Sequence, residues 1–330
     1  MKQKVLETIK KYKLIENGDK LVLGVSGGPD SISMLDILNK IKLDDHIKLD
    51  YEIIVAHINH MIRDEAKEDE LYVKNFCNEH SIDFYSKSID VKNIANTNKI
   101  GTEEAGRNVR YEFFNKILEK THSNKIVIAH NKNDNAETMI MNIIRGSGIS
   151  GLKGIEPKRG IYIRPLIECE RTEIEKYCEE NKLNPRIDKT NFENKYTRNK
   201  IRNIVIPYVK KEFNPNIINT LERLSNLVKE QEDYIEKQVL NIYNRIIMEE
   251  NEKEIILDLK KFNIEEKVIK SRVILYTITR LFGTSQGIEK IHIEDIIKLC
   301  SNNIGNKYLI PNKKMKILIK NHKIFFIKQI

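Results

Sequence analysis

The sequence is poor in several residue types, and each shortage excludes a class of protein. It contains no tryptophan and only four cysteines in 330 residues, none of them in a Cys-x-x-Cys pair. Neither a zinc ribbon nor a redox dithiol is therefore expected. Widely spaced thiols, no signal peptide and no apolar run near the ~20 residues of a membrane span together predict a cytoplasmic protein without a membrane partner.

Positive charge is abundant, but arginine makes up a small part of it. Lysine and arginine number 57 against 48 acidic residues, which gives a net charge of +9 and favours an anionic partner. Only 14 of these cations are arginines, and nine of the 14 lie between Arg107 and Arg202. A guanidinium can bind a phosphate with two parallel hydrogen bonds, so this cluster indicates contacts with phosphate or nucleic acid. A solvated basic surface is the alternative.

Short apolar runs alternate with helical patterns through the first half of the chain. Strands are predicted at 21–25, 53–57, 84–89 and 125–129, and helices near 31–40, 64–80, 103–120 and 135–145. This alternation predicts an α/β fold, doubly wound around a mostly parallel sheet. A long helix near 216–249 and an alternating C-terminal segment predict a helical linker and a small α+β domain. We therefore expect two domains, 1–215 and 216–330.

The stretch LVLGVSGGPDSISMLDIL, residues 21–38, joins the first strand to the first helix of this sheet. A strand that turns sharply into a helix directs backbone N–H groups and the positive helix end toward one point, which suits a phosphate. The two glycines allow the turn, and a Walker A pattern is absent. Taken alone, the loop is also compatible with a plain connection.

Polar residues follow two later strands, at the sheet edge where ligands of parallel sheets bind. His57, Asn59 and His60 suit metal ligands, a base-binding ledge or caps of the next helix. Asp134 and Glu137 share one helical face, where paired carboxylates suit Mg²⁺ binding or proton transfer. On another predicted helix, Arg107, Arg110 and Tyr111 stand on one side and suit either a nucleotide or solvent.

Taken in order, these motifs resemble the tRNA(Ile)-lysidine synthase family of the N-type ATP pyrophosphatases, whose phosphate loop is called the PP-loop. The matching blocks are Ser26–Ser31, Ala56–Arg63, Arg107–Tyr111, Ala129–Thr138, Arg145–Gly148, Arg164–Leu166, Asp188–Asn191 and Arg198–Arg202. The fourth block departs from the family pattern A-H-H-x-D-D-Q-x-E-T, because Asn131, Asn133 and Asn135 replace its second His, its first Asp and its Gln.

The resemblance implies an enzyme that joins L-lysine to C2 of the wobble cytidine of the tRNA(Ile) with a CAU anticodon. ATP would adenylate the cytidine first, with Mg²⁺ present, and AMP and pyrophosphate would be released. The C-terminal domain would bind tRNA, and a homodimer is compatible with the family. The alternatives are a PP-loop tRNA thiolase, which usually needs clustered cysteines, and an inactive tRNA-binding homologue, which the three asparagines suggest.

The resemblance also implies a set of site residues. Those implied to be catalytic are Asp30, Asp134, Glu137, Arg110 and Arg202, with Asp30 and Asp134 as metal ligands. Those implied to bind ATP or pyrophosphate are Ser26, Gly27, Gly28, Pro29, Asp30, Ser31, His57, Asn59, His60, Arg107 and His130. Those implied to contact tRNA or the cytidine are Arg145, Arg164, Asn191, Arg198 and Arg202.

Overall fold

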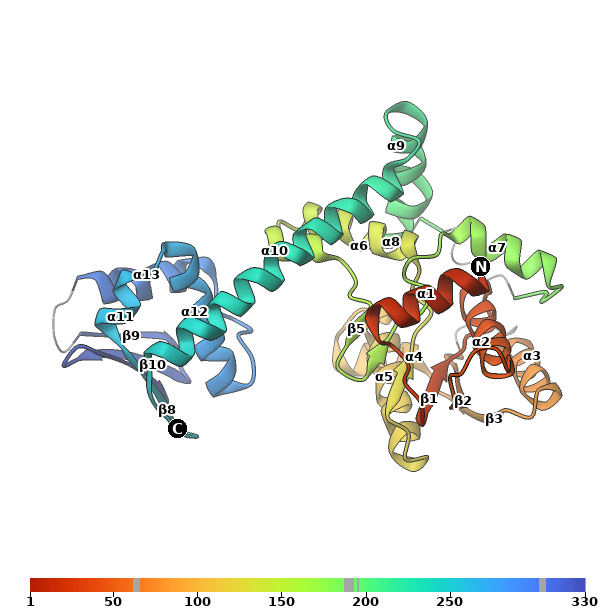
Figure 1. Ribbon diagram of the computed structural model, residues 1–330, viewed down its shortest axis with the longest axis horizontal. Helices are drawn as coiled ribbons and strands as arrows, with labels where there is room; N and C mark the ends of the chain where they lie inside the picture. The colour runs from red at the N-terminus through yellow and green to blue at the C-terminus, as the bar shows by residue number, and fades with distance from the viewer. Residues whose placement is uncertain (62–65, 187–192, 195, 303–306, 330) are drawn as a thin grey trace. The chain divides into compact units, whose positions relative to one another are not determined.

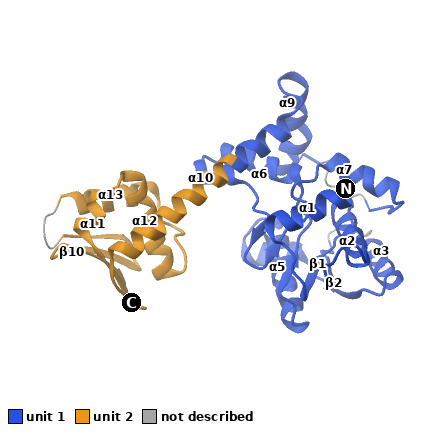
Figure 2. Ribbon diagram, in the orientation of Figure 1, with its two compact units in different colours: residues 1–226 blue, residues 227–330 orange. Residues whose placement is uncertain are grey.

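The computed structural model describes residues 1–61, 66–186, 193–194, 196–302 and 307–329 (Figure 1). The chain divides into two compact units, Met1–Asn226 and Leu227–Ile330 (Figure 2). The change of unit falls inside helix α10 (Ile217–Ile246), and the domain boundary predicted from the sequence lies just before that helix.

A six-stranded sheet in the order β3-β2-β1-β4-β6-β5 forms the centre of the first unit. Its strands are β1 (Asp19–Gly24), β2 (Tyr51–Asn59), β3 (Asp83–Ser88), β4 (Lys125–Val127), β5 (Lys158–Arg159) and β6 (Tyr162–Ile163). All neighbouring pairs are parallel except β5 with β6. The predicted mostly parallel α/β sheet is thus confirmed.

Helices cover both faces of this sheet, because successive side chains of its buried strands point to opposite sides. Leu21 and Leu23 of β1 pack in the layer that holds α1 (Lys2–Tyr12), α2 (Pro29–Lys42), α3 (Ala66–Glu79) and α7 (Arg171–Glu180). Val22 packs on the other face against α5 (Thr102–Lys120), beside which lies α4 (Val91–Asn98). The sheet is therefore doubly wound.

A third apolar cluster joins helices that follow β4 and α7. Helix α6 (Lys132–Ile144) contributes Ala136 and Met139, and the first turns of α10 contribute Ile218 and Leu221. Between them in sequence lie the short helix η1 (Ile149–Lys153) and a nearly continuous helical stretch made of α8 (Thr197–Lys200), the π-helical turn η3 (Ile201–Val205) and α9 (Ile206–Glu212). This packing brings residues near 200 beside α6.

The second unit is an antiparallel sheet in the order β7-β8-β11-β10-β9, packed against helices. Its further elements are β7 (Ile247–Glu250), β8 (Glu254–Asp258), α11 (Leu259–Ile264), α12 (Lys267–Phe282), α13 (Lys290–Ser301), β9 (Lys307–Asn312), β10 (Met315–Lys320) and β11 (Lys323–Lys328). Met315, Ile317 and Ile319 alternate into the core, as expected of a half-buried strand. Throughout the part of the chain that the structure describes, no helix is long and apolar enough to cross a membrane.

Candidate active site

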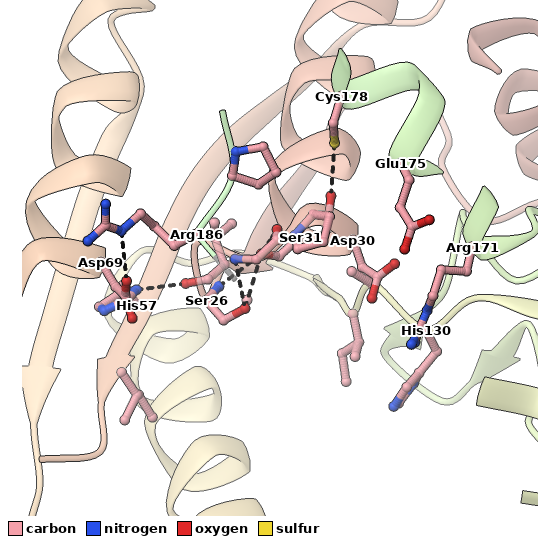
Figure 3. A pocket seen from close by; sticks show the side chains of 18 of the residues that line it. Ser26, Asp30, Ser31, His57, Asp69, His130, Arg171, Glu175, Cys178 and Arg186 are labelled. Atoms are coloured by element: carbon pink, nitrogen blue, oxygen red, sulfur yellow. Dashed lines mark hydrogen bonds and ion pairs between the residues drawn. The ribbon is translucent and has the colours of Figure 1, made fainter. Parts of the chain in front are cut away.

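A cavity of about 1400 Å³ opens at the edge of the sheet where β1, β2 and β4 end (Figure 3). Ligands of parallel sheets bind at this edge. The predicted site residues that line the cavity are Ser26, Gly28, Pro29, Asp30, Ser31, His57, Asn59, His60, Arg110, His130 and Arg202. Motifs spread over more than half of the chain therefore meet in one space.

The loop after β1 is held open by its two serines. Ser26 N donates to Ser31 Oγ at 3.1 Å, and Ser31 Oγ donates to the Gly28 carbonyl at 3.0 Å. Gly27 has a φ of +90°, a left-handed conformation that disfavours any side chain. Gly28 is the N-cap of α2 and has no side-chain cap, while Pro29 opens the helix. The positive end of α2 therefore faces the cavity with no side-chain hydrogen bond capping its N–H groups, as an anion site requires, and Asp30 is the acidic residue of its first turn.

Two neutral histidines border the cavity at the end of β2. His57 Nδ1 donates to the Val25 carbonyl at 2.8 Å, which fixes the tautomer and leaves Nε2 as an acceptor. Burial lowers the pKa of His57, and it lowers the pKa of His60 to about 4. Within the described residues, His57 Nε2 and His60 Nδ1 are buried without a hydrogen-bond partner. Such atoms suit the polar groups of a ligand.

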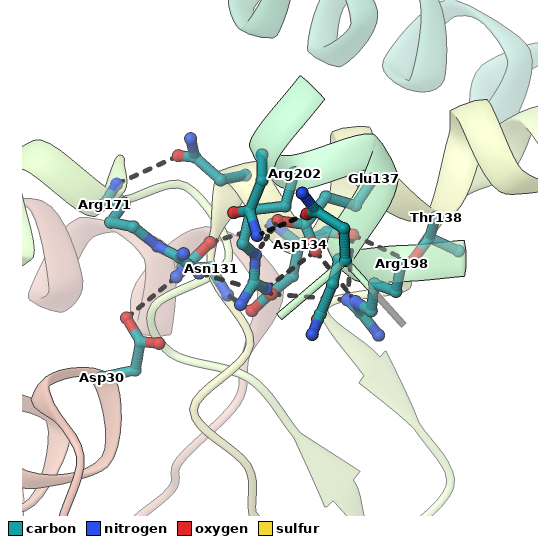
Figure 4. A network of polar contacts seen from close by, with 12 residues as sticks. Asp30, Asn131, Asp134, Glu137, Thr138, Arg171, Arg198 and Arg202 are labelled. Carbon is teal, nitrogen blue, oxygen red and sulfur yellow. Dashed lines mark hydrogen bonds and ion pairs between the residues drawn. The ribbon is translucent and has the colours of Figure 1, made fainter. Parts of the chain in front are cut away.

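Two carboxylates on α6 hold two arginines from the stretch near residue 200 (Figure 4). Glu137, only 1% exposed, accepts from Arg202 Nε at 2.6 Å and from Arg198 Nε at 2.9 Å. Asp134 Oδ1 accepts from Arg202 Nη2 at 3.1 Å and lies 3.4 Å from Arg198 Nη2. Each buried charge is paired, which keeps the cost of burial low. Arg202 is thus held at the cavity wall by both carboxylates.

Asp30, in the first turn of α2, connects the phosphate loop to this network. Its Oδ1 accepts from Asn131 Nδ2 at 2.9 Å, and Asn131 also caps α6 together with Asp134. Burial, and secondly the negative charge of Asp134, raise the pKa of Asp30 to about 6. Arg171 and Arg202 act in the opposite direction. A carboxylate whose charge is disfavoured by its surroundings, at the edge of a cavity, is typical of a functional group.

Comparison with known proteins agrees with this geometry. Residues 1–209 match the family model of the PP-loop domain. A tRNA(Ile)-lysidine synthase of Clostridioides difficile strain 630 is 44% identical to this chain over 97% of the chain and 71% of the relative. The chain belongs to the tRNA(Ile)-lysidine synthase family. The resemblance inferred from the motifs is thereby confirmed.

Two further comparisons show how much of a relative's length this chain matches and which other protein shares its fold. The relative in Clostridium acetobutylicum, also a tRNA(Ile)-lysidine synthase, is 47% identical over 93% of this chain, and the match covers 66% of its own length. The chain thus spans about two thirds of the length of these curated relatives. A U34-tRNA thiolase of Methanococcus maripaludis shares the fold with a TM-score of 0.54 and 22% identity, over 68% of this chain and 77% of the thiolase.

The three asparagines that depart from the family pattern all hold backbone groups. Asn131 Oδ1 accepts from Asp134 N at 3.0 Å, which caps α6. Asn133 Oδ1 accepts from Arg171 N at 3.0 Å, at the start of α7. Asn135 Oδ1 accepts from Ile155 N at 2.6 Å. An aspartate offers the same acceptor oxygen on a side chain of the same length, so Asn133 keeps the acceptor that the family pattern has there. Asn135 is one methylene shorter than the glutamine of the pattern.

Several predicted site residues lie outside the cavity wall. Arg107 is exposed and packs over the Tyr111 ring, and Arg145 is exposed at the C-cap of α6. Arg164 is buried, and its Nε donates to His130 Nδ1 at 3.1 Å; burial and this cation lower the pKa of His130 to about 3. Asn191 lies outside the described residues. The predicted ATP contact of Arg107 and the predicted tRNA contacts of Arg145, Arg164 and Asn191 stay predictions.

One wall of the cavity was not predicted from the sequence. Arg171, Thr172, Glu175 and Cys178 of α7 line it, together with Arg186 beyond the helix. Tyr177 on the same helix donates to Asp36 of α2 at 2.6 Å, and Lys40 contacts both. These contacts join α7 to the helix that begins at the loop. The apolar spacing of residues 171–180 predicts a helix but does not show that its polar face borders the site.

Proposed function

We propose that this protein is a ligase that uses ATP to join L-lysine to C2 of the wobble cytidine of tRNA(Ile) with a CAU anticodon. In the first step, cytidine O2 attacks the α-phosphorus of ATP, the α–β phosphate bond breaks, and pyrophosphate leaves. In the second, the lysine ε-amine attacks C2, the C2–O2 bond breaks, and AMP leaves with that oxygen. The amine loses a proton as the new C–N bond forms.

The observation that carries the proposal is the meeting of the phosphate loop and Arg202 in one cavity. A loop with an uncapped helix end suits the charge of the leaving pyrophosphate. Arg202 and Arg110 bring permanent positive charge to the same space, which suits the phosphate of the adenylated cytidine. Relatives with 41–47% identity over most of the chain carry the lysidine synthase name, which supports this substrate.

The carboxylates of the site fit a bound Mg²⁺. Magnesium usually takes one or two carboxylates and completes its shell with phosphate oxygens and water. Asp30, which lines the cavity, would hold it, since a nearby cation offsets the burial and the charge of Asp134 that raise the pKa of Asp30. Asp134 is the second proposed ligand, and its oxygens accept from Arg202 and from Asn131 N in this structure, so it would have to exchange one of these contacts for the ion. Within the described residues no group of three or more His, Cys, Asp and Glu side chains gathers, so a site shared with ATP fits best. The ion would supply neutralisation of phosphate charge.

Asp134 and Glu137 have two proposed tasks. Their hydrogen bonds to Arg198 and Arg202 set the position of both guanidiniums. They are also our candidates to receive the proton of the lysine ε-amine, whose ordinary pKa is ~10.4. Pairing with the two guanidiniums requires negative charge on both carboxylates. The second task requires the same charge, because an ionised carboxylate is the form that accepts a proton.

Binding of the tRNA is proposed to rest largely on the C-terminal region. Exposed lysines there include Lys307, Lys313, Lys314, Lys320 and Lys328. Lysine side chains bind the phosphates of the tRNA backbone by charge and do not distinguish one base sequence from another. A homodimer and a cytoplasmic location stay predictions.

The thiolase alternative receives no support from the thiols. Cys178 lines the cavity, but burial raises its pKa to about 11, and its Sγ lies 3.7 Å from the Pro29 carbonyl. Such a thiol is a poor nucleophile. Burial also raises the pKa of Cys77, Cys169 and Cys300 to about 12.

Release of AMP from ATP tests the proposal. The purified protein should form AMP only when tRNA(Ile) and L-lysine are both present, and lysine homologues one methylene shorter should be poor substitutes. A thiolase would need a sulfur donor instead of lysine. An inactive homologue would bind the tRNA but form no AMP under any of these conditions, which would refute the proposed activity.

A further inference from the structure

A short segment after α7 lies against the phosphate loop. Arg186 N donates to the Gly27 carbonyl at 3.0 Å, and the Arg186 carbonyl is 3.8 Å from the place where a Cβ on Gly28 would lie. Asn184, Pro185 and Arg186 also line the cavity. Both glycines of the loop are therefore in reach of one residue that is more than 150 positions away in the sequence.

Helix α3 holds this segment through side chains. Arg186 Nε donates to Asp69 Oδ1 at 3.3 Å (Figure 3). The Arg186 guanidinium also pairs with Glu68. The hydroxyl of Tyr72 donates to the Leu183 carbonyl. The Asp69 side chain is 7% exposed, whereas that of Arg186 is 41% exposed. A buried carboxylate that meets a guanidinium is a stronger contact than an ion pair at the surface.

The same turn of α3 touches the loop directly. A Cβ placed on Gly27 would lie 3.7 Å from Asp69 Cβ and 3.6 Å from Val73. The contacts thus form a closed ring from the Gly27 carbonyl through the Arg186 backbone and guanidinium to Asp69, and back to Gly27. A ring of this kind restricts a loop that glycines alone would leave free.

We propose that Arg186 is a positioning residue for ATP. Its ion pair with Asp69 keeps its backbone N–H on the Gly27 carbonyl, and this bond fixes the loop in the conformation that receives the phosphates. Arg186 acts through the loop and not on the reacting atoms. The proposal rests on the proposed function only in taking ATP as the ligand of the loop. Pre-ordering of a binding loop improves affinity by lowering the entropy lost on binding.

Three variants test this role: Arg186→Gln, Asp69→Asn and the double variant. Calorimetry with ATP and Mg²⁺, without tRNA or lysine, gives the affinity, and AMP release gives KM and kcat. We expect each single variant to weaken ATP binding about tenfold and to raise KM for ATP to match, with kcat at saturating ATP within about twofold. The double variant should be no weaker than Arg186→Gln alone, because that substitution already removes the ion pair with Asp69 together with the pair with Glu68. Arg186→Lys should restore part of the affinity.

Lys2→Gln is the matched control. It removes an ion pair with Asp44, at 2.6 Å and with side-chain exposures of 35% and 26%, beyond the far end of α2. ATP affinity of this variant should be that of the wild type.

The proposal is overturned if Arg186→Gln and Asp69→Asn bind ATP within twofold of the wild type, or if their losses add in the double variant. Should Arg186→Gln fail to fold, Arg186→Lys decides, because it keeps the charge but removes the forked guanidinium. An unchanged KM for ATP in that variant also overturns the proposal. A wild type that binds ATP but forms no AMP would refute the proposed function alone, since calorimetry would still test the role of Arg186.

Discussion

Replacing Asp30 with asparagine should stabilise the protein while abolishing its activity. The carboxyl has a folded-state pKa of about 6, above the value of ~3.9 in an unfolded chain. The folded state therefore holds more protons between about pH 4 and 6, so the free energy of unfolding falls as pH rises through this range. Asparagine is neutral throughout and can still accept the hydrogen bond from Asn131.

The gain in the free energy of unfolding follows from the difference between the folded and unfolded pKa of Asp30. Two pKa units correspond to about 3 kcal/mol at most. Because Asp30 borders an open cavity, solvent reduces this to about 1–2 kcal/mol. For a domain of this size, the melting temperature at pH 8 should then rise by about 2–8 °C. At pH 4, where the Asp30 carboxyl is protonated in the folded chain and about half ionised in the unfolded chain, only a small part of this difference should remain.

Scanning calorimetry at pH 4 and pH 8, together with AMP release at pH 8, measures both parts of this prediction. Asp44→Asn is the control, because Lys2 holds the pKa of that carboxyl below its usual range, so its loss should not raise the melting temperature. An Asp30→Asn variant that gains no stability at pH 8, or gains the same at both pH values, would refute the argument from burial. Near-normal AMP release would refute the assignment of the loop.

Three other predictions follow from the same contacts. Glu137→Gln should retain tRNA affinity in a filter-binding assay but lose at least about 100-fold in kcat, because the buried Arg202 and Arg198 lose a charged partner; lost tRNA binding with normal kcat would contradict this. Asn133→Asp should leave kcat within about twofold, since either side chain accepts from Arg171 N; a large gain would show that the asparagine limits activity. A chain ending at Asn226 should keep its ATP affinity in calorimetry, but its tRNA affinity should fall and its salt dependence flatten, by about 0.7–0.9 in slope for each phosphate that the shorter chain no longer neutralises. An unchanged slope would show that the C-terminal region does not bind the tRNA backbone.

The sequence predicted the central strands of the sheet well because β1, β2 and β4 are buried on both faces. Residues 21–25 and 53–57 are continuous apolar runs, and they form the adjacent strands β1 and β2. The last two strands on one side of the sheet, β6 and the edge strand β5, were not predicted, since each has only two residues and no pattern of its own. The helical stretch from Thr197 to Glu212 was also missed. Its apolar residues Ile201 and Ile206 pack against α6, while Arg198 and Arg202 face Asp134 and Glu137.

The order of the motifs along the chain identified most of the residues that line the cavity. It did not show which side chains of different motifs form ion pairs with one another. The spacing of Asp134 and Glu137 suggested a metal or proton site, but it could not show that both accept from Arg202 and Arg198. Those contacts depend on how α6 packs against η3, about 65 residues later. The wall formed by α7 was not predicted either, because the position of this helix depends on contacts between residues far apart in the sequence. Tyr177 of α7 donates to Asp36 of α2, and Lys40 of α2 also binds Asp36.

The identity of the modified nucleoside tests the central proposal most directly. The tRNA(Ile) with a CAU anticodon should be incubated with the protein, ATP, Mg²⁺ and isotope-labelled L-lysine, digested, and its nucleosides measured by mass spectrometry. We predict one new nucleoside, from the wobble position, with the mass of cytidine plus lysine less one water and carrying the label. An unmodified cytidine, or one that has exchanged oxygen for sulfur, would contradict the proposal.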